Sequence, residues 1–188
     1  YVTNGVPGYT TYRVYITTPN TTDQVSAVTC VTSNPLFLET TGDFYQHSNG
    51  GVLPNGINPF LFDFFEGIEF DSWVTIGIDG QPSSAEGGGN VQGLPEPEPW
   101  SSVFESGNGF AIDDIIGSGW FVNPDVTNGI AGDDNKVLLA QLTTNGELTG
   151  EFYVQVFPEG DNINQERVTL TFGGSQCGCM DITACNFS

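Results

Sequence analysis

Short stretches in which apolar and polar residues alternate recur along most of the chain. In residues 10–18 the apolar positions Tyr12, Val14 and Ile16 alternate with more polar ones, and residues 24–32 are also rich in β-branched side chains. This period of two is typical of half-buried strands. A turn-forming Pro-Asn-Thr-Thr-Asp run separates the two segments, so we expect them to form a first strand pair.

The strongest local signal lies in residues 136–157, where two apolar segments flank the Asn-Gly dipeptide at 145–146. Asn-Gly readily supplies the positive φ angles of a type I′ turn, and it therefore predicts a β-hairpin. Residues 166–172 repeat the alternation in a last strand. Roughly eight strands separated by turns favour an all-β fold, an antiparallel β-sandwich of immunoglobulin-like or jelly-roll type.

Two segments depart from the strand pattern. Residues 60–70 are where a short helix is expected, because several of their apolar positions recur at helical spacing. Residues 82–100 have the composition of a long flexible loop inside the domain. We therefore divide the chain into an N-terminal extension (1–8), a β-sandwich domain (9–176) and the start of a Cys-rich appendage (177–188).

The charge of the chain excludes some partners. Twenty-three acidic residues and only three basic ones give a formal net charge of -20. A nucleic-acid surface needs clustered Lys and Arg, so nucleic acid is not an expected partner, and anionic membranes are disfavoured for the same reason. The sequence contains no apolar run of about 18 residues, so membrane insertion is not expected either.

Catalytic chemistry has little support, and we predict that the chain is not an enzyme. His47 is the single histidine, it lies in a Gly/Asn-rich loop, and no Gly-x-Ser-x-Gly motif is present. Paired carboxylates near aromatic residues keep a glycoside hydrolase as a lesser alternative. The acids concerned are Glu66, Glu69, Asp71, Asp113 and Asp114.

Calcium is the one cofactor for which the sequence offers ligands, because it needs only oxygen atoms on irregular loops. The candidate ligands are Asp133, Asp134 and Asp161, in two short acidic and amide-rich turns. Neither turn has the ligand spacing of an EF-hand loop, and the competing interpretation is a solvated turn. No other cofactor is expected.

The three tryptophans bear on a second alternative, a carbohydrate-binding or adhesive module. Trp73 and Trp120 lie in apolar strands and are expected to be buried. Trp100 follows a Pro/Glu repeat, so we expect it to be exposed, where its flat ring could stack on a sugar. Glycans are therefore a candidate partner through Trp100.

The cysteines are distributed unevenly, with Cys30 alone and three others near the end. Residues 178–187, GCMDITACNF, resemble the beginning of a short repeat, Gly-Cys-x-Asp-x-x-Ala-Cys-Asn-Phe/Tyr, found near the C-termini of many secreted proteins of aquatic bacteria and algae. In an extracellular protein, four cysteines suggest two disulfides. One simple pairing joins Cys179 to Cys185 and Cys30 to Cys177; two other pairings, and a free Cys179, remain open.

Other features agree with a location outside the cell. Asn20 and Asn186 each begin an Asn-x-Ser/Thr acceptor sequence for glycosylation, and lysine is almost absent. The chain begins at Tyr1 rather than Met, as expected if a signal peptide was removed or the chain was trimmed. We therefore expect an extracellular, secreted or cell-surface protein.

The body of the chain also has a resemblance. The segments GYTTYRVYITT, FDSWVTIG, GDDNKVLLAQLTT and FYVQVFPEGDN resemble an uncharacterised β-domain that often precedes such repeats. Its architecture is similar to that of pilus-like extracellular fibre subunits, in which another protomer donates the strand that completes an incomplete sandwich. The resemblance implies a secreted structural subunit that polymerises with copies of itself.

This resemblance makes the N-terminal extension the candidate donor strand. The residues concerned are Tyr1, Val2, Thr3, Val6 and Tyr9. The competing interpretation is a frayed terminus. At a net charge of -20, like-charge repulsion opposes polymerisation, so contacts between copies would need large apolar surfaces, screening or divalent cations.

Overall fold

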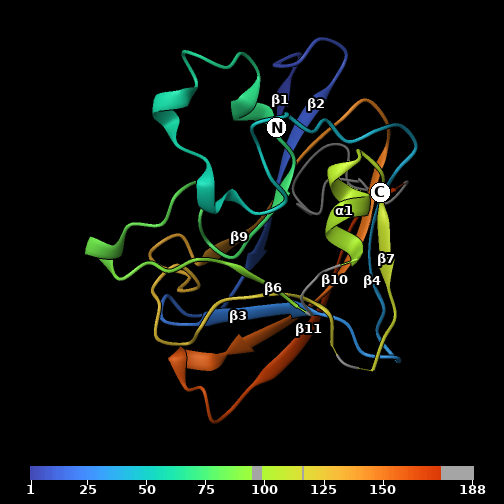
Figure 1. Cartoon of the computed structure of the whole chain (residues 1–188). Helices are drawn as coiled ribbons and strands as arrows, with labels where there is room; N and C mark the ends of the chain where they lie inside the picture. The colour runs from blue at the N-terminus through green and yellow to red at the C-terminus, as the bar shows by residue number, and fades with distance from the viewer. Residues whose placement is uncertain (95–98, 116, 175–188) are drawn as a thin grey trace, which may run out of the picture.

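The computed structural model is an antiparallel β-sandwich with one α-helix, and it describes residues 1–94, 99–115 and 117–174 (Figure 1). The strands are β1 (Val2–Thr3), β2 (Thr10–Thr17), β3 (Gln24–Thr29), β4 (Leu36–Thr40), β5 (Trp73–Val74), β6 (Gln92–Leu94), β7 (Phe110–Ile112), β8 (Gly119–Phe121), β9 (Lys136–Thr144), β10 (Leu148–Phe157) and β11 (Glu166–Gly173). The helix is α1 (Pro99–Glu105), and the 3-10 turns are η1 (Pro54–Gly56), η2 (Pro59–Leu61), η3 (Ile68–Phe70), η4 (Ser84–Glu86) and η5 (Pro158–Gly160).

The strands form two sheets. The first has four strands in the order β1-β2-β9-β5. The second has seven, in the order β6-β8-β3-β10-β4-β7, with β11 paired to β10 outside this path. Because β3 and β4 pair with different parts of β10, they share one of its edges, and β11 runs along the other. The expected all-β sandwich is confirmed.

Consecutive strands change sheet where the sequence predicted hairpins. The segments around Asn145-Gly146 form β9 and β10, but β9 lies in the four-stranded sheet and β10 in the seven-stranded one. Neither residue has the positive φ that a type I′ turn requires. The predicted pairing of β2 with β3 was also wrong, because β2 lies in the four-stranded sheet and β3 in the seven-stranded one. Alternation shows which side chains point inward, and it does not specify the sheet to which a strand belongs.

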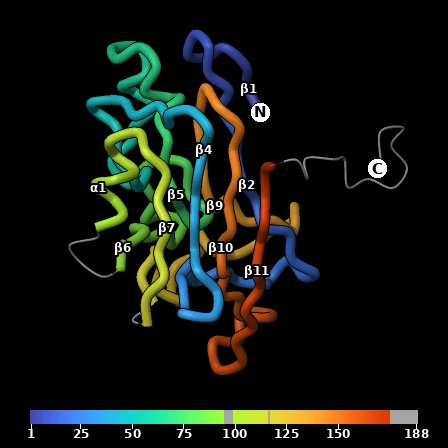
Figure 2. The backbone as a smooth tube through the Cα atoms, turned by 90° about the vertical axis from the view of Figure 1, so that its right-hand side faces the viewer, coloured from blue at the N-terminus to red at the C-terminus, as the bar shows by residue number. Residues whose placement is uncertain are grey.

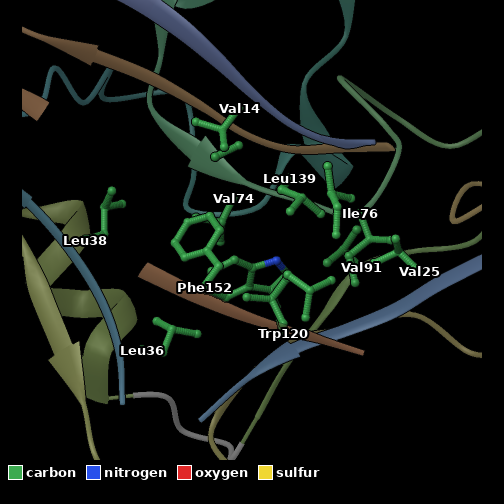
Figure 3. Close-up of a cluster of buried hydrophobic side chains, with 14 of the residues drawn as sticks. Val14, Val25, Leu36, Leu38, Val74, Ile76, Val91, Trp120, Leu139 and Phe152 are labelled. Carbon is green, nitrogen blue, oxygen red and sulfur yellow. The ribbon is translucent and has the colours of Figure 1, made fainter. Parts of the chain in front are cut away.

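The core lies between the two sheets, and aromatic residues form its centre (Figure 3). Trp120 and Phe152 are fully buried, with ring centroids 5.2 Å apart and an edge-to-face geometry. The indole Nε1 of Trp120 donates a hydrogen bond to the Thr75 carbonyl oxygen at 3.0 Å, so the buried donor is satisfied. Trp73 is buried as well, which confirms the expectation for these two tryptophans.

The helix occurs in a different place from the one predicted. Residues 60–70 contain the 3-10 turns η2 and η3 but no α-helix, and Phe60 is 85% exposed. The α-helix α1 instead begins at Pro99, at the end of the segment expected to be a flexible loop. Proline suits the first helical position because its missing N–H would have no partner there. No helix in the described part of the chain is long and apolar enough to cross a membrane.

Candidate functional site

The inner face of the seven-stranded sheet is covered at β10 and uncovered at β11. Val154 of β10 and Val168 of β11 are directly opposite each other in the ladder, so their side chains point to the same face. Val154 is 0% exposed, whereas Val168 is 42% exposed. Leu170 and Phe172, the next inward-facing residues of β11, are only partly buried. Among the described residues, a core-facing surface therefore lies open along β11.

Phe172 is held at this surface by a glycine on the neighbouring strand. Gly150 is the ladder partner of Phe172, and a Cβ atom added to Gly150 would lie 2.3 Å from the Phe172 ring. The ring therefore folds across Gly150 and packs on Phe152, with centroids 4.9 Å apart. A larger residue at position 150 would push Phe172 out of the groove.

The facing wall is β2, at the matching edge of the four-stranded sheet. Val14 and Ile16 of β2 point into the core. On the edge away from β9, β1 pairs only with Thr10 and Thr11. Within the described residues no strand pairs with this edge along residues 12–17, so part of its backbone N–H and C=O groups have no strand partner.

Two hollows follow one another between β2 and β11 and share Tyr15 as a lining residue. One, of about 570 Å³, is lined by residues that include Tyr12, Val14 and Phe172. The other, of about 420 Å³, includes Ile16. Together they form one groove along what we call the open side of the sandwich. Figure 2 shows β2 and β11 on this side and α1, β6 and β7 on the opposite, closed side.

A buried carboxylate joins the two walls at one end of the groove. Asp23, in the connection after β2, accepts hydrogen bonds from the backbone N–H groups of Asn20 at 2.9 Å and of Glu159 in η5 at 2.8 Å. Burial alone would raise the pKa of Asp23, but these donors outweigh burial and hold the pKa below its ordinary value. Asp23 thus ties the β2–β3 connection to the β10–β11 connection in its charged form.

The groove combines two features that recognise an extended peptide. An unpaired strand edge offers main-chain donors and acceptors, and the apolar residues between the edges accept alternate side chains. Its charged lining residues are few, and they include Arg13, Glu147 and Glu166. The arrangement can therefore add a β-strand through main-chain hydrogen bonds and apolar contact.

Of the N-terminal residues predicted to act in assembly, Tyr1, Val2 and Thr3 lie against the start of β2, whereas Val6 and Tyr9 do not line the groove. Val2 and Thr3 form β1 against the start of β2, in the register Val2 to Thr11 and Thr3 to Thr10. Tyr1 is 90% exposed, and its ring lies 6.3 Å from that of Tyr12. Val6 is partly buried, and Tyr9 packs on Tyr45.

Of the four cysteines, Cys30 lies within the described residues. Cys30 is fully buried at the end of β3, and its Sγ lies 3.8 Å from the carbonyl oxygen of Asp114, to which it donates. Burial raises the pKa of the Cys30 thiol. Cys30 has no disulfide partner among the described residues. Cys177, Cys179 and Cys185 lie outside the described residues.

The remaining sequence candidates are scattered rather than brought together. Asn20 is exposed, and its side-chain amide donates to Asp23, while Asn186 lies outside the described residues. The described part of the chain contains no group of three or more acidic, His or Cys side chains placed to hold a metal. The candidate calcium ligands Asp133, Asp134 and Asp161 are all exposed, and Asp134 forms an ion pair with Lys136 at 3.2 Å.

Trp100 is buried, so the expectation that it is exposed was wrong. It is 5% exposed, and its ring centroid lies 5.1 Å from that of Phe110 and 5.6 Å from that of Trp120. Trp100 lies in the first turn of α1, and its indole points inward. Trp100 cannot present a flat face to a sugar in this conformation.

Two of the acids considered for hydrolysis hold loops in place. Asp71 is fully buried and accepts hydrogen bonds from the N–H groups of His47 at 2.6 Å and Gly51 at 2.9 Å. Asp114 likewise accepts from the N–H groups of Gly117 at 2.8 Å and Ser118 at 3.2 Å. These contacts give both carboxylates a role in loop structure.

Comparisons with protein-family models, with curated proteins and with solved structures each found no match to this chain. The features of this chain that bear on its function are therefore the geometry of the groove and the residues that surround it.

Proposed function

We propose that this chain is a secreted structural subunit of a pilus-like extracellular filament, and that a neighbouring copy adds a β-strand in the groove between β2 and β11. The observation that carries the proposal is the exposure of the inward-facing side of β11. Val168 has the position of a core residue but is 42% exposed, opposite the fully buried Val154. A strand from another copy would supply the missing cover.

The energetics of strand addition favour this occupant. Complete burial of an aliphatic or aromatic side chain contributes about 1.5–3 kcal/mol, and the half-covered Leu170 and Phe172 would gain part of that amount. The unpaired edge of β2 would gain main-chain hydrogen bonds at the same time. Both gains come from groups that already point into the groove, so little reorganisation of the acceptor is needed.

The charge distribution is compatible with association of a very acidic chain. A net charge of -20 repels copies from one another, but a groove lined mainly by uncharged residues places the contact away from most of that charge. Because the repulsion acts over the Debye length, added salt should promote assembly rather than oppose it. In this proposal the partners are copies of the same chain, and its role is structural rather than catalytic.

The extracellular location rests on the resemblance of the C-terminal segment and on the glycosylation acceptor at Asn20. Asn20 is exposed in the connection after β2, where a glycan could be attached without entering the core. Detection of a glycan on Asn20 in native material, by mass spectrometry, would support this location.

The test compares two valines that have the same exposure on opposite sides of the sandwich. Val168 on β11 and Val103 on α1 are each 42% exposed. Val168→Glu places a charge in the groove, and Val103→Glu places the same charge on the closed side. We expect the wild-type chain and Val103→Glu to form filaments in negative-stain images and Val168→Glu to remain monomeric. Filaments of Val168→Glu at wild-type yield would show that the groove is not the assembly site.

A further inference from the structure

We infer that the groove admits a strand from one end only, because Asp23 closes the other end. The N-terminal segment of a second copy therefore lies antiparallel to β2, with its N-terminus at the end that Asp23 closes. This inference rests on the proposed function, because it assumes that a second copy fills the groove. It adds the direction of entry and the polarity of the added strand.

We call the end of the groove at which Asp23 joins the two walls the closed end. Thr18, Pro19 and Asn20 line the 420 Å³ hollow here from the side of β2, and Pro158 lines it from the side of β11. The Asp23 carboxylate joins the two connections through the N–H groups of Asn20 and Glu159. A chain passing through this end would have to break those hydrogen bonds.

Within the described part of the chain, the opposite end is open. It is lined by Glu147, Gly173 and Gly174 together with the start of β2. Among the described residues, no hydrogen bond joins Gly173 or Gly174 to β2. The two glycines have φ angles of 78° and 65° and carry no side chain that could block the entrance. A free chain end can therefore enter here.

Because β2 has a known direction, entry from the open end determines the polarity of the added strand relative to β2. β2 runs from the open end towards the closed end, and β11 runs the opposite way, as the lining residues of the two hollows show (Figure 2). A segment that enters with its N-terminus first finishes with that terminus near Thr17, so it is antiparallel to β2. A C-terminal segment entering by the same end would be parallel to β2.

The chain's own β1 already has this polarity. β1 pairs with Thr10 and Thr11 in the antiparallel sense, on the edge of β2 that faces the groove. Among the described residues, that edge has no strand partner along residues 12–17. An added strand in the same line would continue the ladder that β1 begins. Residues 12–17 of β2 span about 20 Å at 3.4 Å per residue, so they have room for about six residues of an added strand, and residues 1–6 of the second copy fill them.

The N-terminal segment offers side chains at a suitable spacing. Val2 and Val6 are four residues apart, so in an extended strand they point to the same face. With the N-terminus at the closed end, Val2 would lie near Ile16 and Val168, and Val6 near Phe172. The present turn at Asn4, which has a φ of 57°, would have to open into the extended form.

Photo-cross-linking measures this polarity directly. Two synthetic peptides with the sequence of residues 1–8 carry the diazirine amino acid photo-leucine in place of either Val2 or Val6. Each is added in excess to the full chain and irradiated, and the cross-linked sites are located by mass spectrometry. We expect the label at position 2 to react with Ile16 or Val168, and the label at position 6 with Tyr12 or Phe172. A scrambled peptide should lose both reactions.

The outcomes separate the polarity from the proposed function. The reversed pattern, with position 2 at Phe172, would overturn the polarity and leave the strand-acceptor groove standing. Absence of cross-links in the groove, when Val168→Glu still abolishes filaments, would overturn N-terminal donation and point to another segment of the second copy, such as residues 175–188. If cross-links are absent and Val168→Glu assembles normally, the proposed function is wrong as well.

Discussion

Inward-facing apolar residues are buried on one long side of the sandwich and partly exposed on the other. On the closed side, α1 covers the edge of the core, and Phe104 and Phe110 are buried. On the open side, Val168, Leu170 and Phe172 face inward from β11 and have no comparable cover in the described part of the chain. The difference indicates that the closed side carries the stability of the single chain. The open side keeps apolar surface that can stabilise an assembly.

The closed side is held by aromatic packing. Phe104 of α1 contacts Phe44 with ring centroids 5.3 Å apart and Phe110 at 5.6 Å, both edge to face. On the same face of α1 as Phe104, Trp100 packs against Phe110 and Trp120. These contacts join the helix to both the seven-stranded sheet and the loop at Phe44.

The largest expected effect comes from removing the Phe104 ring from the closed side. Phe104→Ala should lower the free energy of unfolding by about 3–5 kcal/mol, because it removes a fully buried ring and leaves a cavity. Phe172→Ala on the open side is the matched control, and it should cost clearly less because its ring is only partly buried. Urea unfolding of the two variants measures the difference. Equal losses would mean that the open side is packed as well as the closed side.

A buried carboxylate adds a pH-dependent element to the closed side. Burial raises the pKa of Asp71 to about 7, although the N–H groups of His47 and Gly51 act in the opposite direction. Gly50 is needed between these donors, because a Cβ atom there would lie 2.0 Å from Asp71 Oδ2. Glu105, at the end of α1, adds like charge near Asp71, and burial raises its pKa too.

Asp71 should therefore make the single chain less stable as the pH rises. Between the unfolded pKa near 3.9 and the folded value of about 7, only the folded chain holds the proton, so the free energy of unfolding falls by up to about 1.4 kcal/mol per pH unit. Asp71→Asn has no group to ionise and should lack this slope. Urea unfolding of both proteins from pH 4.5 to 7.5 measures it. Parallel curves would show that Asp71 ionises with a normal pKa.

Asp23 at the end of the groove should show the opposite sign. Its folded pKa lies below the ordinary value, so its stabilising contribution is present above the unfolded pKa near 3.9 and is lost as the pH falls through the folded pKa. Asp23→Asn should cost about 1–3 kcal/mol at pH 7, because backbone donors lose a charged acceptor. The cost should shrink as the pH approaches 3. A cost that is constant with pH would mean that the charge of Asp23 does not stabilise the groove end.

The sequence predicted the strands better than their arrangement. Alternation located β2, β10 and β11, because a half-buried strand must present apolar residues to one face. It did not show that β9 and β10 belong to different sheets, since Asn145-Gly146 suits several turn geometries. The helix α1 was missed because the segment before Trp100 is rich in glycine and proline. The two side chains that this helix buries, Trp100 and Phe104, pack on residues distant in the sequence.

The groove could not have been located from the sequence. Val168, Leu170 and Phe172 alternate just as Phe152, Val154 and Val156 of the buried strand do. The difference between the two sets arises from the strand order, which places β11 at an edge beyond the cover of the other sheet. The resemblance to fibre subunits suggested an incomplete sandwich, but only the structure locates the uncovered surface at β2 and β11.

The smallest expected effect on the stability of the single chain is that of Val168→Ala. Val168→Ala should change the free energy of unfolding of the monomer by no more than about 0.5 kcal/mol, because the side chain remains largely in water. Val154→Ala, directly opposite, should cost about 2 kcal/mol because it empties a buried site. If strand addition buries Val168, the same alanine should weaken assembly by roughly 1.4 kcal/mol, a tenfold higher critical concentration. Sedimentation at a series of protein concentrations measures that value. A critical concentration equal to the wild type would mean that Val168 stays exposed in the filament, and the two sides of the sandwich would then differ in stability alone.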